Sequence, residues 1–212
     1  MFKLQIKYLS FFFGIVSILS FFNILYSYYF NLYLNLDTYY FTLLASFILF
    51  ITFFKFGKYD IKSNIFQKIL TIFLGYLLIP LVLSIPFYFS IYNLTFSNSF
   101  FEAISGFTST GFTVFDNIKL IDQSLVIWRS STQWLGGLYF LFSIIYLIDI
   151  YDDSFKKTLT NYISFNSSEI LKQAVKIFIL YSSLTIMIFI ILNIFSIRTF
   201  DSLNLALTII SS

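Results

Sequence analysis

Five long apolar stretches constrain this sequence more than any other feature. The hydrocarbon core of a bilayer is about 30 Å thick, so a helix needs roughly 20 apolar residues to cross it. The stretches that meet this requirement are residues 8–30, 39–55, 66–90, 124–149 and 170–197. The chain is 58% hydrophobic and only 11% charged, whereas soluble domains average about 25% charged residues. The sequence therefore predicts an all-α membrane protein with about five transmembrane helices.

The basic residues indicate how these helices are oriented. If the N-terminus is cytoplasmic, ten lysines fall on the cytoplasmic side: Lys3, Lys7, Lys55, Lys58, Lys62, Lys68, Lys156, Lys157, Lys172 and Lys176. The outer side then keeps only Lys119, Arg129 and Arg198. Because cytoplasmic loops of membrane proteins are enriched in Lys and Arg, we expect a multi-pass protein of the cytoplasmic (inner) membrane with its N-terminus inside. The first stretch is too long for the apolar part of a signal peptide and has no small-residue cleavage site, so we expect a retained span.

The composition restricts the chemistry that the chain can perform. It has no Cys and no His, which excludes thiol nucleophiles, imidazole acid–base catalysis and the usual zinc sites. A membrane enzyme would need clustered carboxylates or a nucleophile–base pair at one interface. The only acidic cluster is Asp149, Asp152 and Asp153, and we interpret it as a solvated helix end. We therefore predict neither enzymatic activity nor a cofactor.

One outer segment, residues 91–123, differs from its apolar neighbours. Ser99 followed by Glu102 has the spacing of a capping box, so we expect a helix to begin at Ser99 and to reach about Phe107. Such a helix is too short to cross a membrane, and a short apolar helix between two spans indicates a re-entrant segment.

A run of hydroxyl residues around one glycine follows this helix, from Thr108 to Thr113. Irregular backbone is tolerated at membrane depth only where it is buried in protein or lines a watery cavity. The helix would point its partially negative C-terminal end at a cation, and the loop carbonyls could replace the water shell of a potassium ion. Gly111 would supply the backbone freedom for this loop. The pattern alone leaves open an ordinary turn on the membrane surface.

Two motifs resemble one known family. Phe101-Glu102-Ala-Ile-Ser-Gly-Phe-Thr-Ser-Thr-Gly-Phe-Thr, followed by Trp128-Arg129-Ser-Ser-Thr-Gln133-Trp134-Leu-Gly136-Gly137, is similar to the first pore repeat of the Trk/Ktr/HKT potassium transporters. The resemblance is best to the TrkH branch, which has two extra spans before the first span–pore–span repeat. Here Leu138-Tyr139 follows the paired glycines, whereas the family usually has small residues, which leaves the packing of this helix in doubt.

The resemblance implies a fold of four such repeats around one pore, of which the chain covers about the first third to half. Residues 1–62 would be the two extra helices and 63–150 the first span–pore–span repeat with its filter. Residues 151–212 would be a cytoplasmic loop and an incomplete second repeat that stops before its filter glycine.

The resemblance also assigns roles to individual residues. Ser109 and Thr110 match filter positions whose carbonyls or hydroxyls face the ion, Gly111 matches the selectivity glycine, and Thr108 and Phe112 flank them. Ser212 would belong to the second filter.

Three residues would support the filter from behind it. A membrane-embedded arginine should be paired, and Glu102 is a reasonable partner for Arg129, although Arg129 could instead extend to the outer headgroups. Gln133 could bond the pore helix or only bridge two helices.

The function implied is potassium uptake through a pore-forming subunit, with potassium as the transported substrate. The alternative is a non-conducting accessory or assembly subunit. The expected partners are membrane lipid, a cytoplasmic nucleotide-binding regulatory subunit of the TrkA type facing the basic loops at 55–68 and 151–176, and a second copy in a dimer. No nucleic-acid partner is expected.

Overall fold

A computed structural model describes residues 6–57, 65–147 and 170–211, and in these residues the only regular secondary structure is helical. Its helices are α1 (Ile6–Tyr29), α2 (Leu36–Phe56), α3 (Ile65–Leu83), α4 (Ile85–Tyr88), α5 (Phe96–Phe107), a 3-10 turn (Ile118–Leu120), α6 (Gln123–Leu147), α8 (Ile170–Ile194) and α9 (Thr199–Ile209). The predicted all-α membrane fold is confirmed, and each of the five apolar stretches contains a long helix. The acidic cluster at 149–153 and the second-filter residue Ser212 lie outside the described residues.

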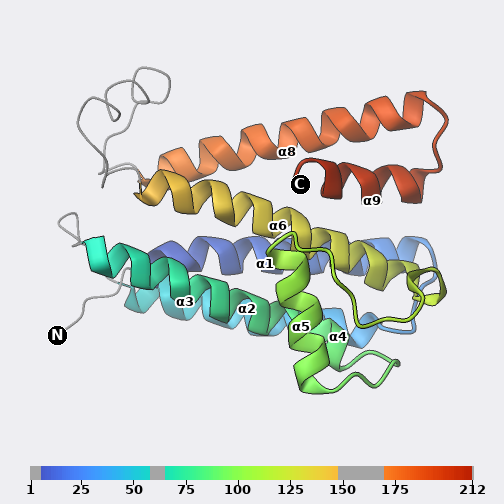
Figure 1. Cartoon of the computed structure of the whole chain (residues 1–212), viewed down its shortest axis with the longest axis horizontal. Helices are drawn as coiled ribbons and strands as arrows, with labels where there is room; N and C mark the ends of the chain where they lie inside the picture. Colours follow the sequence, from blue (N-terminus) through green and yellow to red (C-terminus); the bar gives the residue numbers. More distant parts are fainter. Residues whose placement is uncertain (1–5, 58–64, 148–169, 212) are drawn as a thin grey trace.

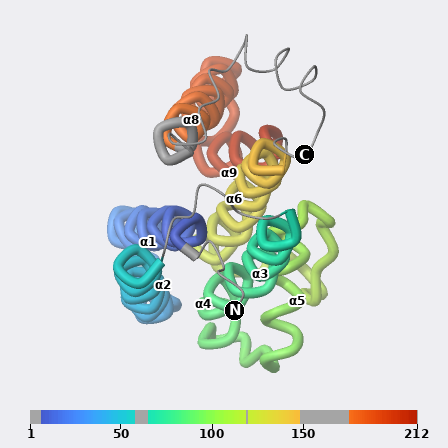
Figure 2. The backbone as a smooth tube through the Cα atoms, turned by 90° about the vertical axis from the view of Figure 1, so that its left-hand side faces the viewer, coloured from blue at the N-terminus to red at the C-terminus, as the bar shows by residue number. Residues whose placement is uncertain are grey.

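Four helices of the described chain are long and apolar enough to cross a membrane, namely Lys7–Tyr29, Leu36–Phe56, Ile65–Tyr88 and Val175–Ile194. The fifth long helix, α6, has 25 residues but carries Arg129 and several hydroxyl and glycine residues. It lies in the middle of the assembly, in contact with α1, α3, α5, α8 and α9 (Figure 2). Because its neighbours cover most of its surface, α6 needs less apolar character than a helix that faces lipid.

The long helices run along one common direction, the short α5 lies across it, and the short α9 runs back beside α8 (Figure 1). With 12 and 11 residues, α5 and α9 are each less than 20 Å long at about 1.5 Å per residue, so neither crosses the roughly 30 Å core of a bilayer. Both end beside the middle of α6. The predicted short helix between two spans is thus present, and a second one follows α8.

A largely buried polar cluster fixes the N-terminal end of α6 to the N-terminal helix pair. Asp122, just before α6, accepts a hydrogen bond from the Asn35 amide at 3.2 Å and one from the Ser124 hydroxyl at 2.5 Å. Tyr39 of α2 bonds the same Ser124 hydroxyl at 2.9 Å, and the Asn23 amide of α1 donates to the Ser124 carbonyl at 3.2 Å. Since most of these groups are withdrawn from water, their mutual bonds hold α1 and α2 against the start of α6.

Candidate functional site: a half-crossing helix and its loop

The start of α5 differs from the sequence prediction. The helix begins at Phe96, and the Thr95 side chain caps it by accepting a hydrogen bond from the Asn98 amide at 3.3 Å. Ser99 lies inside the first turns, where its hydroxyl donates to the Thr95 carbonyl at 2.9 Å. The predicted capping box of Ser99 and Glu102 is therefore wrong, because Thr95 provides the cap earlier and the Glu102 carboxylate bonds a different segment.

After Phe107 the chain leaves the helix and turns back on itself. Ser109 and Gly111 both have positive φ, 53° and 82°, a conformation that glycine adopts at little cost and other residues rarely adopt. The amides of Ser109 and Thr110 donate to the Gly106 and Ser105 carbonyls, at 2.9 and 3.0 Å. The loop is therefore a fixed turn and not a continuation of α5.

The carbonyl groups of this loop fall into two sets. Those of Gly111 and Phe112 each accept a hydrogen bond from Arg129 Nη2 at 3.3 Å, and that of Phe112 also accepts one from the Ser105 hydroxyl at 2.6 Å. The carbonyls of residues 108–110 accept no hydrogen bond from any residue that the structure describes. The turn thus leaves three consecutive carbonyl oxygens available while the two that follow are held by the protein.

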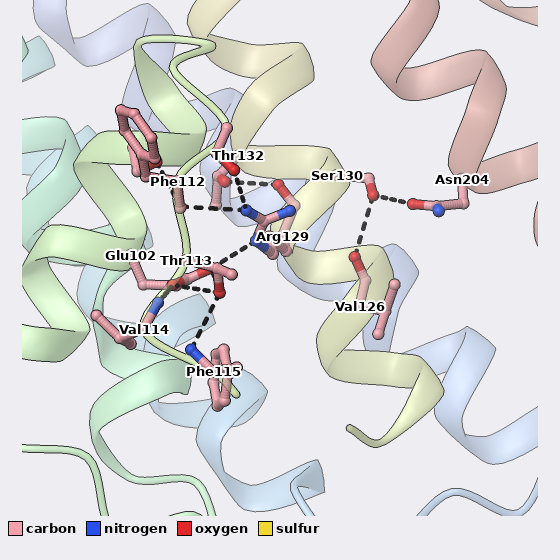
Figure 3. A network of polar contacts seen from close by, with 12 residues as sticks. Glu102, Phe112, Thr113, Val114, Phe115, Val126, Arg129, Ser130, Thr132 and Asn204 are labelled. Atoms are coloured by element: carbon pink, nitrogen blue, oxygen red, sulfur yellow. Dashed lines mark hydrogen bonds and ion pairs between the residues drawn. The ribbon is translucent and has the colours of Figure 1, made fainter. Parts of the chain in front are cut away.

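Glu102 is the centre of a polar network behind the loop (Figure 3). Its carboxylate is fully buried and accepts hydrogen bonds from the Thr113 hydroxyl at 3.0 and 3.1 Å, from the Val114 amide at 3.0 Å and from Arg129 Nε at 2.5 Å. The expected pairing of Arg129 with Glu102 is present, and the Arg129 side chain is only 19% exposed. Arg129 therefore faces the loop and does not extend to the headgroups.

The closest approaches between α5 and α6 occur at glycines. A Cβ added at Gly106 would overlap the Thr132 hydroxyl, and one at Gly136 would overlap the Phe107 carbonyl. Gln133, for which the sequence left open a bond to the pore helix or a bridge between two helices, is half-buried on α6 and forms no hydrogen bond with α5 among the described residues. Its neighbour Thr132 makes the contact with α5 instead.

The unusual Tyr139 fits because a glycine faces it on another helix. Tyr139 is fully buried, its hydroxyl donates to the Ile72 carbonyl at 2.9 Å, and a Cβ at Gly75 of α3 would collide with that hydroxyl. The missing small residue on α6 is thus matched by a glycine on α3, which resolves the doubt about the packing of this helix.

The loop and the end of α9 border one hollow of about 450 Å³. Its lining residues come from α3, the α5 loop, α6 and the end of α9, and they are Tyr76, Phe107, Thr108, Ser109, Gly136, Gly137, Phe140 and Ser211. The Ser109 hydroxyl donates to the Ser211 carbonyl at 3.0 Å. The two half-crossing segments therefore meet directly at this hollow.

The structure thus brings Thr108 and Ser109 to the hollow, and Glu102 and Arg129 together behind the loop. Sequence reasoning did not assign roles to Ser105, Thr113, Thr132 and Ser211. Ser105 and Thr113 lie inside the quoted motif, so their hydroxyls were a signal available in the sequence. Thr132 and Ser211 reach Gly106 of α5 and Ser109 of the loop only through the fold.

Comparison with solved structures shows a related fold. The potassium transporter TrkH from Vibrio parahaemolyticus superposes with a TM-score of 0.76 over 98% of this chain and 42% of its own, at 16% identity. Trk system potassium uptake proteins of Escherichia coli K12 also match in sequence: TrkG at 30% identity over 106 residues and TrkH at 33% over 82 residues. The chain thus has a fold similar to that of TrkH, and parts of its sequence are similar to Trk potassium uptake proteins.

The matches cover unequal shares of the proteins compared. An uncharacterised cation transporter of Methanocaldococcus jannaschii is 27% identical over 149 residues, which are 66% of this chain and 30% of that protein. The E. coli TrkG and TrkH matches cover 46% and 38% of this chain, and 22% and 17% of those proteins. The chain thus spans less than a third of the length of the curated relatives it matches. No family model matches the sequence.

Proposed function

We propose that this chain contributes part of a potassium-conducting pore in the cytoplasmic membrane, with the loop at 108–111 facing the ion. One observation supports the proposal most: a helix too short to cross the bilayer is followed by three carbonyls, those of residues 108–110, with no hydrogen-bond donor in the described chain. Thr108 and Thr110 are exposed and Ser109 is half-buried in the described chain, so a dehydrated cation can reach these carbonyl oxygens and be coordinated by them.

The proposed filter is shorter than the sequence motif suggested. Because the Gly111 and Phe112 carbonyls accept hydrogen bonds from Arg129, we assign them to holding the loop. Thr108, Ser109 and Thr110 would supply the oxygens for potassium, and the C-terminal end of α5 would add its partial negative charge. An interior-negative membrane potential would drive uptake by about 2.3 kcal/mol per charge per 100 mV.

The wider arrangement follows the same proposal. The N-terminus would be cytoplasmic, residues 1–62 would form the extra helix pair, and 63–150 would form the first span–pore–span repeat. Residues 151–212 would begin a second repeat, with Ser212 near its filter. A regulatory subunit of the TrkA type would meet the cytoplasmic basic loops, and the complete protein would be a dimer. The role in ion transport within this arrangement is supported by the similarity to a cation transporter and to potassium uptake proteins.

Rubidium uptake by a host that lacks its own potassium uptake systems tests the proposal. We expect uptake from cells that express the protein and its loss with Gly111→Val, because a β-branched residue is strained at φ 82°. Leu205→Ala is the matched control, because Leu205 is partly exposed on the other half-crossing helix. Normal uptake by the folded Gly111→Val variant would contradict the proposal.

The same host distinguishes the alternative of a non-conducting accessory subunit. Such a subunit would give no uptake by itself and would increase uptake only when a separate Trk-type transporter is supplied. A pore-forming chain would give rubidium uptake in the host without that transporter.

A further inference from the structure

A second cavity lies on the other side of α6 from the loop. It has a volume of about 570 Å³ and lies between α1, α6, α8 and α9. Most of its lining is aliphatic or aromatic, including Phe22 of α1, Ile127 of α6, Ile186 of α8 and Leu203 of α9. Its volume is in the range of sites that hold small organic ligands.

The periodicity of α6 separates this cavity from the proposed pore. At about 100° per residue, Ile127 and Ser131 share one face of the helix, whereas Gly136 and Phe140 share the opposite face. The first pair lines this cavity and the second pair lines the hollow beside the loop. In Figure 2 the cavity helices α1 and α8 stand on the far side of α6 from α5. The cavity is therefore a separate site that conduction does not use.

Two buried polar atoms at this cavity lack partners among the described residues. They are Oδ1 of Asn23, whose side chain is 2% exposed, and the hydroxyl oxygen of Tyr26. Both residues line the cavity. A buried hydrogen-bonding group without a partner costs about 1–3 kcal/mol in an apolar site. A ligand that brings polar atoms to these groups would remove that cost.

A basic side chain, that of Arg198, lies near Tyr26. Arg198, at the start of α9, is exposed, and both it and Asp122 are close enough to act electrostatically on Tyr26. The Asp122 carboxylate already accepts hydrogen bonds from Asn35 and Ser124. Tyr26 lies one helical turn from the end of α1 at Tyr29, so the polar atoms are near the end of the span and not at its centre. The site thus combines an apolar cavity, the Tyr26 hydroxyl as a hydrogen-bond donor, and Arg198 as a nearby cation.

We propose that this cavity binds an anionic phospholipid. One acyl chain fills the space beside Ile127 and Leu203, the Tyr26 hydroxyl donates to an ester carbonyl oxygen, and Arg198 pairs with the phosphate. Asn23 Oδ1 accepts a hydrogen bond from water, which the ester region of a bilayer still carries. A membrane supplies this ligand at high concentration, and an arginine guanidinium forms strong charge-assisted hydrogen bonds with a phosphate group.

Native mass spectrometry of the purified protein, with phosphatidylglycerol or phosphatidylcholine added in mixed micelles, tests this assignment. We expect one phosphatidylglycerol retained per chain, in preference to phosphatidylcholine. Tyr26→Phe and Arg198→Gln should each reduce retention about fivefold, as expected for the loss of one hydrogen bond or one charge contact of about 1 kcal/mol. Ile127→Trp, which fills the cavity, should abolish retention.

Matched controls keep the result specific. Tyr28→Phe changes an exposed tyrosine of the same helix that bonds Tyr40, and Lys176→Gln removes an exposed charge from α8; both should retain the lipid as the unchanged protein does. Equal retention of the two lipids, or retention by the folded Ile127→Trp variant, would overturn the proposal, as would a second copy of the chain occupying the cavity. Rubidium uptake is a separate measurement, so failure here leaves the proposed pore function intact.

Discussion

The two half-crossing helices, α5 and α9, have the same backbone plan but are held in different ways. Three residues have the same spacing and the same burial in both helices. The pairs are Thr95 with Arg198, Ser99 with Ser202, and Ala103 with Ala206. The two serines and the two alanines are fully buried. The Ser99 amide donates to the Thr95 carbonyl at 2.9 Å, and the Ser202 amide to the Arg198 carbonyl at 2.8 Å. The resemblance between the helices therefore extends to individual hydrogen bonds.

The difference lies on the face that meets the following segment. Glu102 of α5 is fully buried in its ion pair, whereas the corresponding Leu205 of α9 is 39% exposed. Gly106 of α5 lies against Thr132, whereas the corresponding Ile209 is 49% exposed. The comparison indicates that the shared small residues are enough for either short helix to pack. The buried ion pair and the close glycine contact are present only on α5, which the polar network behind its loop holds in place.

The largest expected effect comes from removing the buried charge with Glu102→Gln. The change leaves Arg129 without its counterion and replaces one acceptor oxygen with a donor facing the Val114 amide. Breaking a buried ion pair costs about 3–5 kcal/mol, and because Arg129 retains some exposure we expect about 3 kcal/mol. The free energy of unfolding, measured by denaturing-detergent titration in mixed micelles, checks this.

The equivalent change on α9, Leu205→Gln, is the matched control and should alter the free energy of unfolding by less than about 0.5 kcal/mol. The double variant Glu102→Leu with Arg129→Leu gives the first helix the apolar character of the second. It should recover only part of the loss, because apolar residues can replace the ion pair itself but leave the Val114 amide and the Thr113 hydroxyl without their acceptor. Similar losses from Glu102→Gln and Leu205→Gln would show that the two helices are anchored alike.

The second prediction concerns the closest contact of α5. Gly106→Ala places a Cβ against the Thr132 hydroxyl, and overpacking of this kind costs about 1–3 kcal/mol. Adding Thr132→Ala removes the overlapping atom, so the double variant should be more stable than Gly106→Ala by itself. The corresponding Ile209→Ala on α9 should have little effect on the same measurement. If the double variant were as unstable as Gly106→Ala, the loss of stability would not come from the overlap with the Thr132 hydroxyl but from another part of the structure, for instance the backbone.

Much of this architecture could be predicted from the sequence, because apolar length and local motifs determine it. The five long helices and the short helix before Thr108 were expected, and the pairing of Glu102 with Arg129 was one of two alternatives for that arginine. The N-cap at Thr95 was not, because a capping box is a local pattern and could not show that the Glu102 carboxylate bonds Thr113 and Val114.

Contacts between distant segments were beyond local patterns. Gly75 accommodates Tyr139 across two helices, and Ser109 meets Ser211 only after both short helices have been placed. The sequence showed an unusual tyrosine on α6 but not the glycine opposite it.

The smallest expected effect separates the two helix starts. Thr95 caps α5 through its side chain, whereas Arg198 at the start of α9 makes no side-chain capping bond. Thr95→Ala should therefore cost about 1 kcal/mol, whereas Arg198→Thr should gain a few tenths to about 1 kcal/mol by adding the missing bond. Both are measured as free energies of unfolding in detergent without phosphatidylglycerol, so that a headgroup contact of Arg198 does not contribute. Suppose that Arg198→Thr gives no gain in stability while Thr95→Ala gives a loss. The start of α9 would then be fixed by its packing and not by its cap. The two helices would differ from their first residue onward.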